Sequence, residues 1–339
     1  MPCPTSLLPE LYNGMSVQLD IERLYREGVE FAVYRFPGED MVRVCSDGES
    51  LEINRWNTPC ACNISVRPGR KVLGSLEPWR DSTSKESYLE STQALIDTLK
   101  TRGGKCVRMR TICGSCKSLD INAVVHDLFA RFADAFCYCV FTAETGLWIG
   151  ATPEVLVDIA DGQLRTMSLA GTRLAGEDAE WDRKNVDEQQ FVTSFICGEL
   201  MLQGLVPECG RTRTLRYGAI EHICTDIVAA CSCGTNLSGL LEGLSPTPAV
   251  CGQPREVALK EISQVEDAPR RCYAGYLLHK DRDGRVRAYV NLRCAHISPS
   301  GWCIYAGGGI TADSDALAEW HETEAKASAL LRIFNEHSL

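Results

Sequence analysis

Residues 305–326 read Tyr-Ala-Gly-Gly-Gly-Ile-Thr-Ala-Asp-Ser-Asp-Ala-Leu-Ala-Glu-Trp-His-Glu-Thr-Glu-Ala-Lys. The glycines predict a tight turn just before a helix, where backbone N–H groups can approach an anion closely. Within the helix, Glu319, Glu322 and Lys326 are spaced i, i+3, i+7 and therefore share one face. A surface helix with solvated charges would also fit this segment alone, but comparable features recur upstream at the ends of strand-like runs.

The composition indicates a globular protein with a large core. The chain has 339 residues, of which 45% are hydrophobic and 24% charged, as in ordinary soluble proteins. The net charge of −10 argues against nonspecific nucleic-acid binding. No apolar run has the length of a membrane span, and the first residues lack a basic region followed by an apolar stretch. We therefore expect a cytoplasmic protein with no nucleic-acid or membrane partner, and a monomer by default.

The 18 cysteines are scattered through strand-like and helix-like runs. A chain of this length does not need a disulfide framework, and cytosolic chains rarely have one. Cys113 and Cys116 form a C-x-x-C pair, but no second pair has the spacing of a zinc site and no thioredoxin-like unit surrounds it. We interpret the cysteines as structural, with a cysteine-based metal or redox protein as the rival reading.

Alternating apolar segments joined by turn sequences predict β-hairpins. They cover 137–142 with 147–151, 155–159 with 163–169, 276–279 with 287–297, and 287–297 with 302–306. A further alternating strand is expected at 105–110, and helical periodicity appears at 87–100, 120–132 and 184–202. Local hairpins with helices between them predict an α+β fold with large, mainly antiparallel sheets flanked by helices.

Several short motifs occur in one order along the chain. They are Lys105-Cys-Val-Arg-Met-Arg110, Gly150-Ala-Thr-Pro-Glu154, Leu169-Ala-Gly-Thr-Arg173, Lys184-Asn-Val-Asp-Glu188-Gln189, Pro246-Thr-Pro-Ala-Val250 with Gly252, and the Glu319–Lys326 helix. In this order they resemble the motifs of the chorismate-utilising enzymes, and most closely those of the isochorismate synthases. The resemblance covers about residues 87–335. It implies that 1–85 is a divergent N-terminal part of the same fold and that 86–339 is the chorismate-binding catalytic region, together one compact domain.

The resemblance also implies a reaction. It predicts Mg²⁺-dependent conversion of chorismate to isochorismate, by addition of water at C2 and loss of the 4-hydroxyl, for menaquinone or siderophore biosynthesis. A salicylate synthase, which eliminates pyruvate from isochorismate, is the closest alternative. An aminating relative such as anthranilate synthase, or an inactive relative, is a more distant one.

By the same resemblance, Lys105 matches the general base and Glu154 the general acid. A lysine is a base only as the free amine, so we expect burial and the neighbouring Arg108 and Arg110 to favour loss of its proton. Glu154 must hold its proton near neutral pH, which requires an apolar environment. The alternative for each is an exposed residue at the end of a strand or in a turn.

Glu188 and Glu322 match the family's magnesium ligands, and carboxylates are suitable donors for Mg²⁺. Glu319 is expected to support this site. The alternative for Glu188 is a surface ion pair with Lys184, four residues earlier on the helix.

The remaining matches concern the substrate. Arg293 and Lys326 match contacts to its carboxylates, for which an arginine fork is well suited. The other expected substrate-binding residues are Gly171, Thr172, Ala249, Gly307, Gly308 and Gly309, several of them through backbone N–H groups. His222 is either structural or part of the active site.

The chain departs from the family pattern at two histidines. Ser245 stands where the family has His before Pro-Thr-Pro, and Gln189 stands where many members have His after the metal-binding Glu. The first change puts substrate positioning in question. Ala249 matches the water-using branch, since aminating relatives carry a threonine-containing version of this loop.

Overall fold

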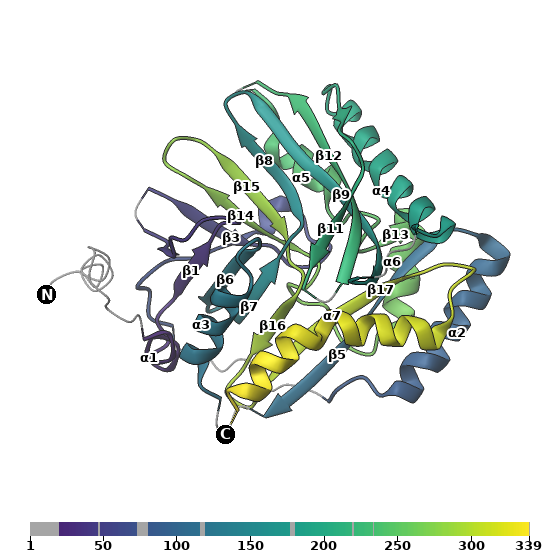
Figure 1. Cartoon of the computed structure of the whole chain (residues 1–339). Coiled ribbons are helices and arrows are strands. Elements are labelled where there is room, and N and C mark those ends of the chain that lie inside the picture. The colour runs from purple at the N-terminus through teal and green to yellow at the C-terminus, as the bar shows by residue number, and fades with distance from the viewer. Residues whose placement is uncertain are drawn as a thin grey trace, which may run out of the picture.

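The computed structural model describes residues 20–46, 48–72, 81–115, 119–176, 180–218, 220–232 and 234–338. Two large sheets face each other and fan apart, with helices on their outer faces (Figure 1). Every strand pairing in these residues is antiparallel. The predicted α+β class with mainly antiparallel sheets is confirmed.

The first sheet has eight strands and the second has nine. In spatial order, the first contains β13 (Gly252–Gln253), β5 (Lys105–Ser115), β17 (Gly301–Ile310), β16 (Cys294–Ile297), β7 (Gly146–Thr152), β6 (Phe136–Thr142), β1 (Phe31–Arg35) and β2 (Arg43–Val44). The second contains β10 (Glu208–Cys209), β12 (Ile220–Ala230), β9 (Gln163–Leu174), β8 (Val155–Ala160), β15 (Val286–Val290), β14 (Tyr276–Lys280), β3 (Ser50–Ile53) and β4 (Ile64–Ser65), with β11 (Arg213–Tyr217) paired to β12. The N-terminal strands thus extend both sheets.

Two of the places where the chain passes from one sheet to the other lie side by side. One crossing joins β7 to β8 through Pro153 and Glu154, and the other joins β15 to β16 through 291–293. The Val290 N–H donates to the Glu154 carbonyl (3.0 Å), and the Ala151 N–H donates to the Arg293 carbonyl (3.1 Å). The single strand predicted for 287–297 was therefore wrong, because a change of sheet interrupts it where Arg293 adopts a left-handed φ of 49°.

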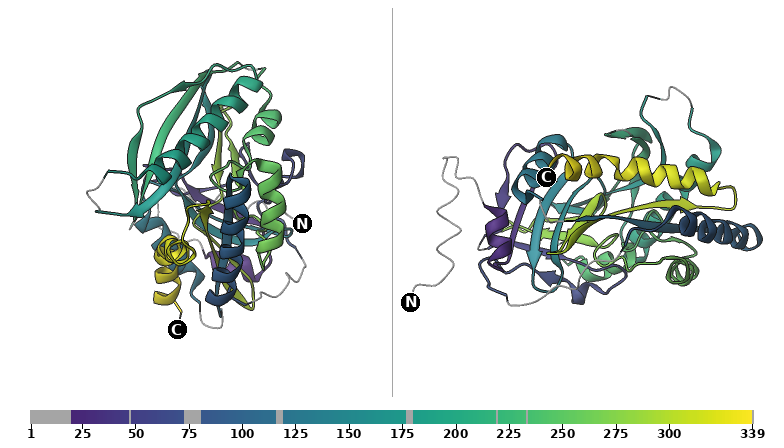
Figure 2. Two further views of the ribbon diagram at one scale, coloured as in Figure 1. Left: turned by 90° about the vertical axis from the view of Figure 1, so that its right-hand side faces the viewer. Right: turned by 90° about the horizontal axis from the view of Figure 1, so that it is seen from below.

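The helices cover the outer faces of the sheets (Figures 1 and 2). They are α1 (Ile21–Arg26), α2 (Lys85–Arg102), α3 (Ile121–Arg131), α4 (Arg183–Leu202), α5 (Leu237–Leu244), α6 (Arg255–Val265) and α7 (Ala316–Glu336), with a short 3₁₀ turn η3 (Cys60–Cys62). Helix α7 runs across the first sheet, while α4 lies against β9 and β12 of the second. Asp182 and Asp315 accept backbone N–H groups at the starts of α4 and α7, which fixes where these two helices begin.

The glycine-rich segment is a strand and not the predicted turn. Gly307–Gly309 lie inside β17, which pairs with β5 from Gly301 to Ile310, and α7 begins only at Ala316. The glycines have ordinary strand φ values, since none is among the residues with positive φ. Because these glycines have no side chain, they leave space for neighbouring charged side chains.

The main apolar core fills the space between the sheets, where Phe136 of β6 stacks on Tyr289 of β15 with ring centroids 4.3 Å apart. A second cluster lies between the first sheet and helices α3 and α7. None of the described helices combines the length and apolarity that crossing a membrane requires. Cys116, half of the C-x-x-C pair, lies outside the described residues, whereas Cys113 lies in β5 directly opposite Cys303 of β17.

Candidate active site

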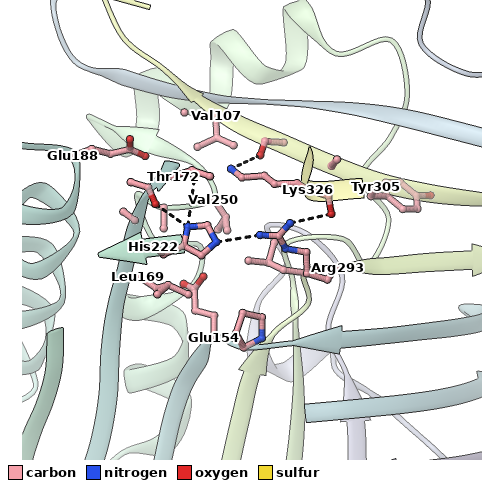
Figure 3. Close-up of a pocket in the computed structure, with 18 of the residues that line it drawn as sticks. Val107, Glu154, Leu169, Thr172, Glu188, His222, Val250, Arg293, Tyr305 and Lys326 are labelled. Carbon is pink, nitrogen blue, oxygen red and sulfur yellow. Dashed lines mark hydrogen bonds between the residues drawn. The ribbon is translucent and has the colours of Figure 1, made fainter. Parts of the chain in front are cut away.

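A pocket opens where the chain crosses between the sheets, beside the glycines of β17 (Figure 3). Nine of the twelve predicted site residues line it: Glu154, Gly171, Thr172, Glu188, Ala249, Arg293, Gly307, Gly309 and Lys326. The other three adjoin it. Lys105 contacts Glu188, Glu322 contacts Lys326, and Gly308 lies between Gly307 and Gly309.

Lys105 is buried, with its side chain 2% exposed, and Nζ lies 2.6 Å from Glu188 Oε1. Arg108 and Arg110 were expected beside it, but this was wrong. Strand residues alternate between faces, and both arginines point to the opposite face of β5, toward Ser91 and Thr323. The charge next to Lys105 is therefore negative. Burial opposes ionisation of Glu188, but the charge and hydrogen bond of Lys105 hold the Glu188 pKa below its ordinary value.

Glu154 is 3% exposed and lies in the crossing from β7 to β8. Its carboxyl points into the pocket near His222 and Arg293 (Figure 3). Burial raises its pKa to about 8, although Lys105, Lys326 and Arg293 act in the other direction. The folded protein therefore holds a proton on Glu154 at neutral pH, as a general acid must.

His222 lies inside the site and holds Arg293. The guanidinium only donates, so His222 Nε2 accepts from Arg293 Nη2 (3.1 Å), while Nδ1–H donates to the Gly171 carbonyl (2.7 Å). These two partners fix the tautomer. Burial, followed by the charges of Arg293 and Lys326, lowers the His222 pKa to about 3. A neutral His222 therefore orients the Arg293 fork, whose Nη1 donates to the Lys326 carbonyl (2.9 Å).

The glycines of β17 leave room for charged groups on both of its faces. A Cβ on Gly309 would lie 2.7 Å from Glu188 Oε1, and a Cβ on Gly308 would lie 3.1 Å from Glu319 Oε2. The Gly307 carbonyl accepts from Lys326 Nζ (3.0 Å), so it points away from β5. Because N–H and C=O of one strand residue point the same way, the N–H groups of Gly307 and Gly309 also face away from β5 and can meet an anion.

Three lysines form ion pairs with three glutamates near the glycines of β17. The Nζ–Oε1 distances are 2.6 Å for Lys105–Glu188, 2.8 Å for Lys184–Glu319 and 2.6 Å for Lys326–Glu322. The surface pair Lys184–Glu188 is not the pair that forms. Glu319 Oε2 is buried and has no hydrogen-bond partner among the described residues. Burial, then the neighbouring Glu322, raises the Glu319 pKa.

The donor chemistry here fits a hard divalent cation. No three His, Cys, Asp or Glu in the described ranges are grouped as a ready metal site, because each carboxylate turns toward a lysine. Even so, oxygen-only donors and an unpartnered buried carboxylate oxygen are what Mg²⁺ could satisfy. A cation would have to replace lysine contacts.

The two departures from the family motifs have different consequences. Ser245 does not line the pocket, and its carbonyl accepts from Arg255 Nη2 (2.5 Å) at the end of α5. Gln189 is buried behind Glu188, where Nε2 reaches the hydroxyls of Thr225 (2.8 Å) and Ser168 (2.9 Å). Neither change removes a group from the pocket wall.

Sequence reasoning gave no role to the apolar wall of the pocket. Leu169, Val250, Leu292 and the stacked pair Tyr273–Tyr305, with centroids 5.6 Å apart, line it. Tyr273 lies against Gly307, since a Cβ on that glycine would be 2.8 Å from its Oη. Leu169 and Val250 lie within the motifs quoted above, but an apolar or aromatic residue has the same sequence pattern in a core and in a pocket wall.

The sequence pattern of the family described as "Chorismate binding enzyme" matches residues 75–335. The chain belongs to the chorismate-binding enzyme family. It is 32% identical over 275 residues to the salicylate biosynthesis isochorismate synthase of Pseudomonas aeruginosa, covering 78% of this chain and 58% of the relative. It is 30% identical over 197 residues to anthranilate synthase component 1 of Aquifex aeolicus, covering 54% and 40%. This member of the family thus spans about half the length of these curated relatives.

The fold of this chorismate-binding enzyme is shared with solved structures. MenF, the menaquinone-specific isochorismate synthase from Escherichia coli, superposes with a TM-score of 0.79 over 95% of this chain and 92% of that chain, at 20% identity. At that identity the likeness concerns the fold alone. The fold, the residues of the pocket and the family match therefore all indicate a chorismate-binding enzyme.

Proposed function

We propose that the protein is an Mg²⁺-dependent isochorismate synthase, which adds water at C2 of chorismate as the 4-hydroxyl leaves. The observation that carries this proposal is a buried carboxyl with a raised pKa, that of Glu154, in a pocket that the buried lysine Lys105 adjoins through its contact with Glu188. One group can donate a proton to the leaving oxygen while the other takes one from water. Printed names of relatives as isochorismate synthases favour the same reaction.

In this mechanism Lys105 accepts a proton from the attacking water, and Glu154 donates its proton to the departing 4-hydroxyl, which leaves as water. The double bond shifts as the new C–O bond forms and the old one breaks. Lys105 Nζ donates to Glu188 Oε1 at 2.6 Å, so this contact must break before the nitrogen can take a proton from water. The apolar wall keeps bulk water away from Glu154 and so maintains its raised pKa.

Substrate carboxylates would be bound by the cationic side of the pocket. Arg293 presents its fork with His222 behind it, and Lys326 lies close by. The outward N–H groups of Gly307 and Gly309 add donors. These contacts hold the ring between acid and base, so that the reaction becomes effectively unimolecular.

We assign the metal to Glu188 and Glu322, with Glu319 in support. When bound, Mg²⁺ would supply positive charge for a substrate carboxylate and for the glutamates themselves. The enzymes that act on the product decide whether it enters menaquinone, siderophore or salicylate synthesis. A cytoplasmic location is part of the same proposal.

The test is incubation with chorismate and Mg²⁺, followed by chromatographic identification of the product. We expect isochorismate as the main product, also in high ammonium near pH 8, because Ala249 matches the water-using loop. Salicylate with equimolar pyruvate would identify a salicylate synthase instead. Anthranilate or an aminated ring as the main product would overturn the water-adding assignment and leave the family intact.

A further inference from the structure

Two thiols that do not line the pocket lie in contact with each other. Cys197 Sγ and Cys209 Sγ are 3.5 Å apart. Cys197 is in the last turns of α4, and Cys209 is in β10 at the edge of the second sheet. A disulfide has an S–S distance of about 2.05 Å, so the two sulfurs are in contact and have to move closer together to bond.

The thiol pair ends a row of polar contacts that ties α4 to the second sheet. Gln189, Thr193 and Cys197 are spaced i, i+4, i+8 and therefore lie on one face of the helix. Gln189 Nε2 donates to Thr225 Oγ1 of β12, and Thr193 Oγ1 lies 2.7 Å from Ser168 Oγ of β9. Glu188, which contacts the Lys105 ammonium, immediately precedes Gln189. The row thus runs from the site to the two cysteines.

We propose that Cys197 and Cys209 are an oxidisable pair, which a low-molecular-weight disulfide such as glutathione disulfide converts into an intramolecular disulfide that tethers α4 to β10. A Cys209 thiolate attacks glutathione disulfide, forms a mixed disulfide and releases one glutathione thiolate. The Cys197 thiolate then attacks Cys209 Sγ and releases the second glutathione. Two protein thiols are oxidised, and one glutathione disulfide is reduced to two thiols.

The environments of the two thiols set this order. Cys209 is exposed, whereas Cys197 is half-buried. Burial, followed by the contact with Cys209, raises the Cys197 pKa to about 11. Thiolate fraction and access decide which thiol attacks first. The exposed Cys209 therefore reacts with the oxidant, and Cys197 resolves the mixed disulfide because it is already in contact.

The experiment is oxidation of the full-length protein with glutathione disulfide, then alkylation and peptide mapping. No Lys or Arg lies between Lys184 and Arg211, so trypsin releases both cysteines on one peptide, 185–211. We expect that peptide to be lighter by two hydrogen atoms and to resist alkylation. After cleavage at Glu199 the two halves should stay joined until reduced. Amide hydrogen exchange in α4 should be severalfold slower in the oxidised protein.

Variants distinguish the order of steps. In Cys197→Ser, Cys209 should accumulate as a glutathione mixed disulfide, while in Cys209→Ser, Cys197 should stay unmodified over the same time. Cys62→Ser, which removes another exposed thiol, should behave as the parent. A glutathione adduct on Cys209 without a cross-link in the parent, or a cross-link from Cys209 to a different cysteine, would overturn the pair. Unchanged exchange in α4 after cross-linking would overturn the tether.

Discussion

Strand β5 carries buried cations on both faces, and the two faces satisfy them differently. On the pocket face, Lys105 pairs with a carboxylate, that of Glu188. On the opposite face, Arg110 donates to Thr323 Oγ1 (2.6 Å) and its guanidinium carbon lies 3.7 Å from the centroid of the Trp320 ring. Arg108 donates to Ser91 and lies over Tyr88, and its nearest carboxylate oxygen, Oδ2 of the half-exposed Asp267, is 3.9 Å away. The Glu188 carboxylate is also a suitable ligand for a divalent cation, whereas an aromatic ring is not. We therefore assign chemistry to the first face and stability to the second.

The largest effect is expected at Lys105. Lys105→Ala should lower kcat by about 10²–10⁴-fold, the usual range for a general base, while chorismate still binds. Steady-state kinetics and calorimetric binding measure the two quantities. Lys100→Ala, at an exposed position in α2 with a side chain 54% exposed, is the matched control. Near-parental kcat in Lys105→Ala would remove it as the base and with it the contrast between the faces.

Glu154→Gln should also reduce kcat by about 100-fold or more, and it should change how stability depends on pH. The ordinary carboxyl pKa is 4.5, and in the folded protein it is about 8. The folded state thus binds a proton that the unfolded state has lost, so this stabilising contribution is present in full below pH 4.5 and disappears as the pH rises through 8.

Between pH 5 and 8 the parent should therefore lose stability relative to Glu154→Gln, by at most about 1.4 kcal/mol per pH unit. Urea unfolding at each pH measures the difference in free energy of unfolding. Parallel pH profiles for the two proteins would show that Glu154 is not held protonated by burial.

Glu188→Gln and Glu322→Gln should weaken Mg²⁺ activation by about 10–100-fold and leave the fold intact. Each removes a carboxylate charge that a cation would need. Titration of activity with Mg²⁺, together with direct metal binding by calorimetry, gives the affinity. Glu324→Gln is the control, since Glu324 is on the same helix but half-exposed and paired with His321. Equal activity in chelator and in Mg²⁺ would end the metal assignment.

The smallest effect on catalysis is expected on the other face of β5. Arg110→Met should leave kcat essentially unchanged and lower the free energy of unfolding by about 2 kcal/mol, because a desolvated cation–π contact and a hydrogen bond are lost. Chemical denaturation measures the free energy of unfolding, and steady-state kinetics on the same preparation measures kcat. A fall in kcat comparable to that of Lys105→Ala would erase the distinction between the faces.

The sequence predicted the hairpins and helices well because their signals are local. Asp161-Gly162 between alternating runs marked β8–β9, and the period of 184–202 marked α4. It could not reveal that 287–297 divides between two sheets, since both halves alternate and the left-handed Arg293 has no pattern of its own. Three glycines in a row also look the same in a turn and in a strand that needs room for Glu188 and Glu319.

Most of the residues that gather at the pocket were predicted, but the partners of their charged groups were not. Motif resemblance named residues that gather at the pocket. Nearness in the sequence wrongly suggested Arg108 and Arg110 as neighbours of Lys105, and helix spacing offered a Lys184–Glu188 pair as the alternative to the family role of Glu188. Partners of buried charges are set by three-dimensional packing, in which α4 and α7 bring Lys184 to Glu319 across 135 residues of sequence. The tautomer of His222 likewise depends on Gly171 and Arg293, which no sequence spacing connects to it.

In the proposed mechanism, Lys105 and Glu154 together add solvent water to chorismate and expel its 4-hydroxyl. The most direct measurement is turnover in ¹⁸O-labelled water with Mg²⁺, followed by mass spectrometry of the isolated product. We expect isochorismate that carries one ¹⁸O atom in its new ring hydroxyl, with the label absent from unreacted chorismate at early times. Unlabelled isochorismate would mean that the hydroxyl migrates within the substrate, and it would contradict the assignment of Lys105 as the base that activates water.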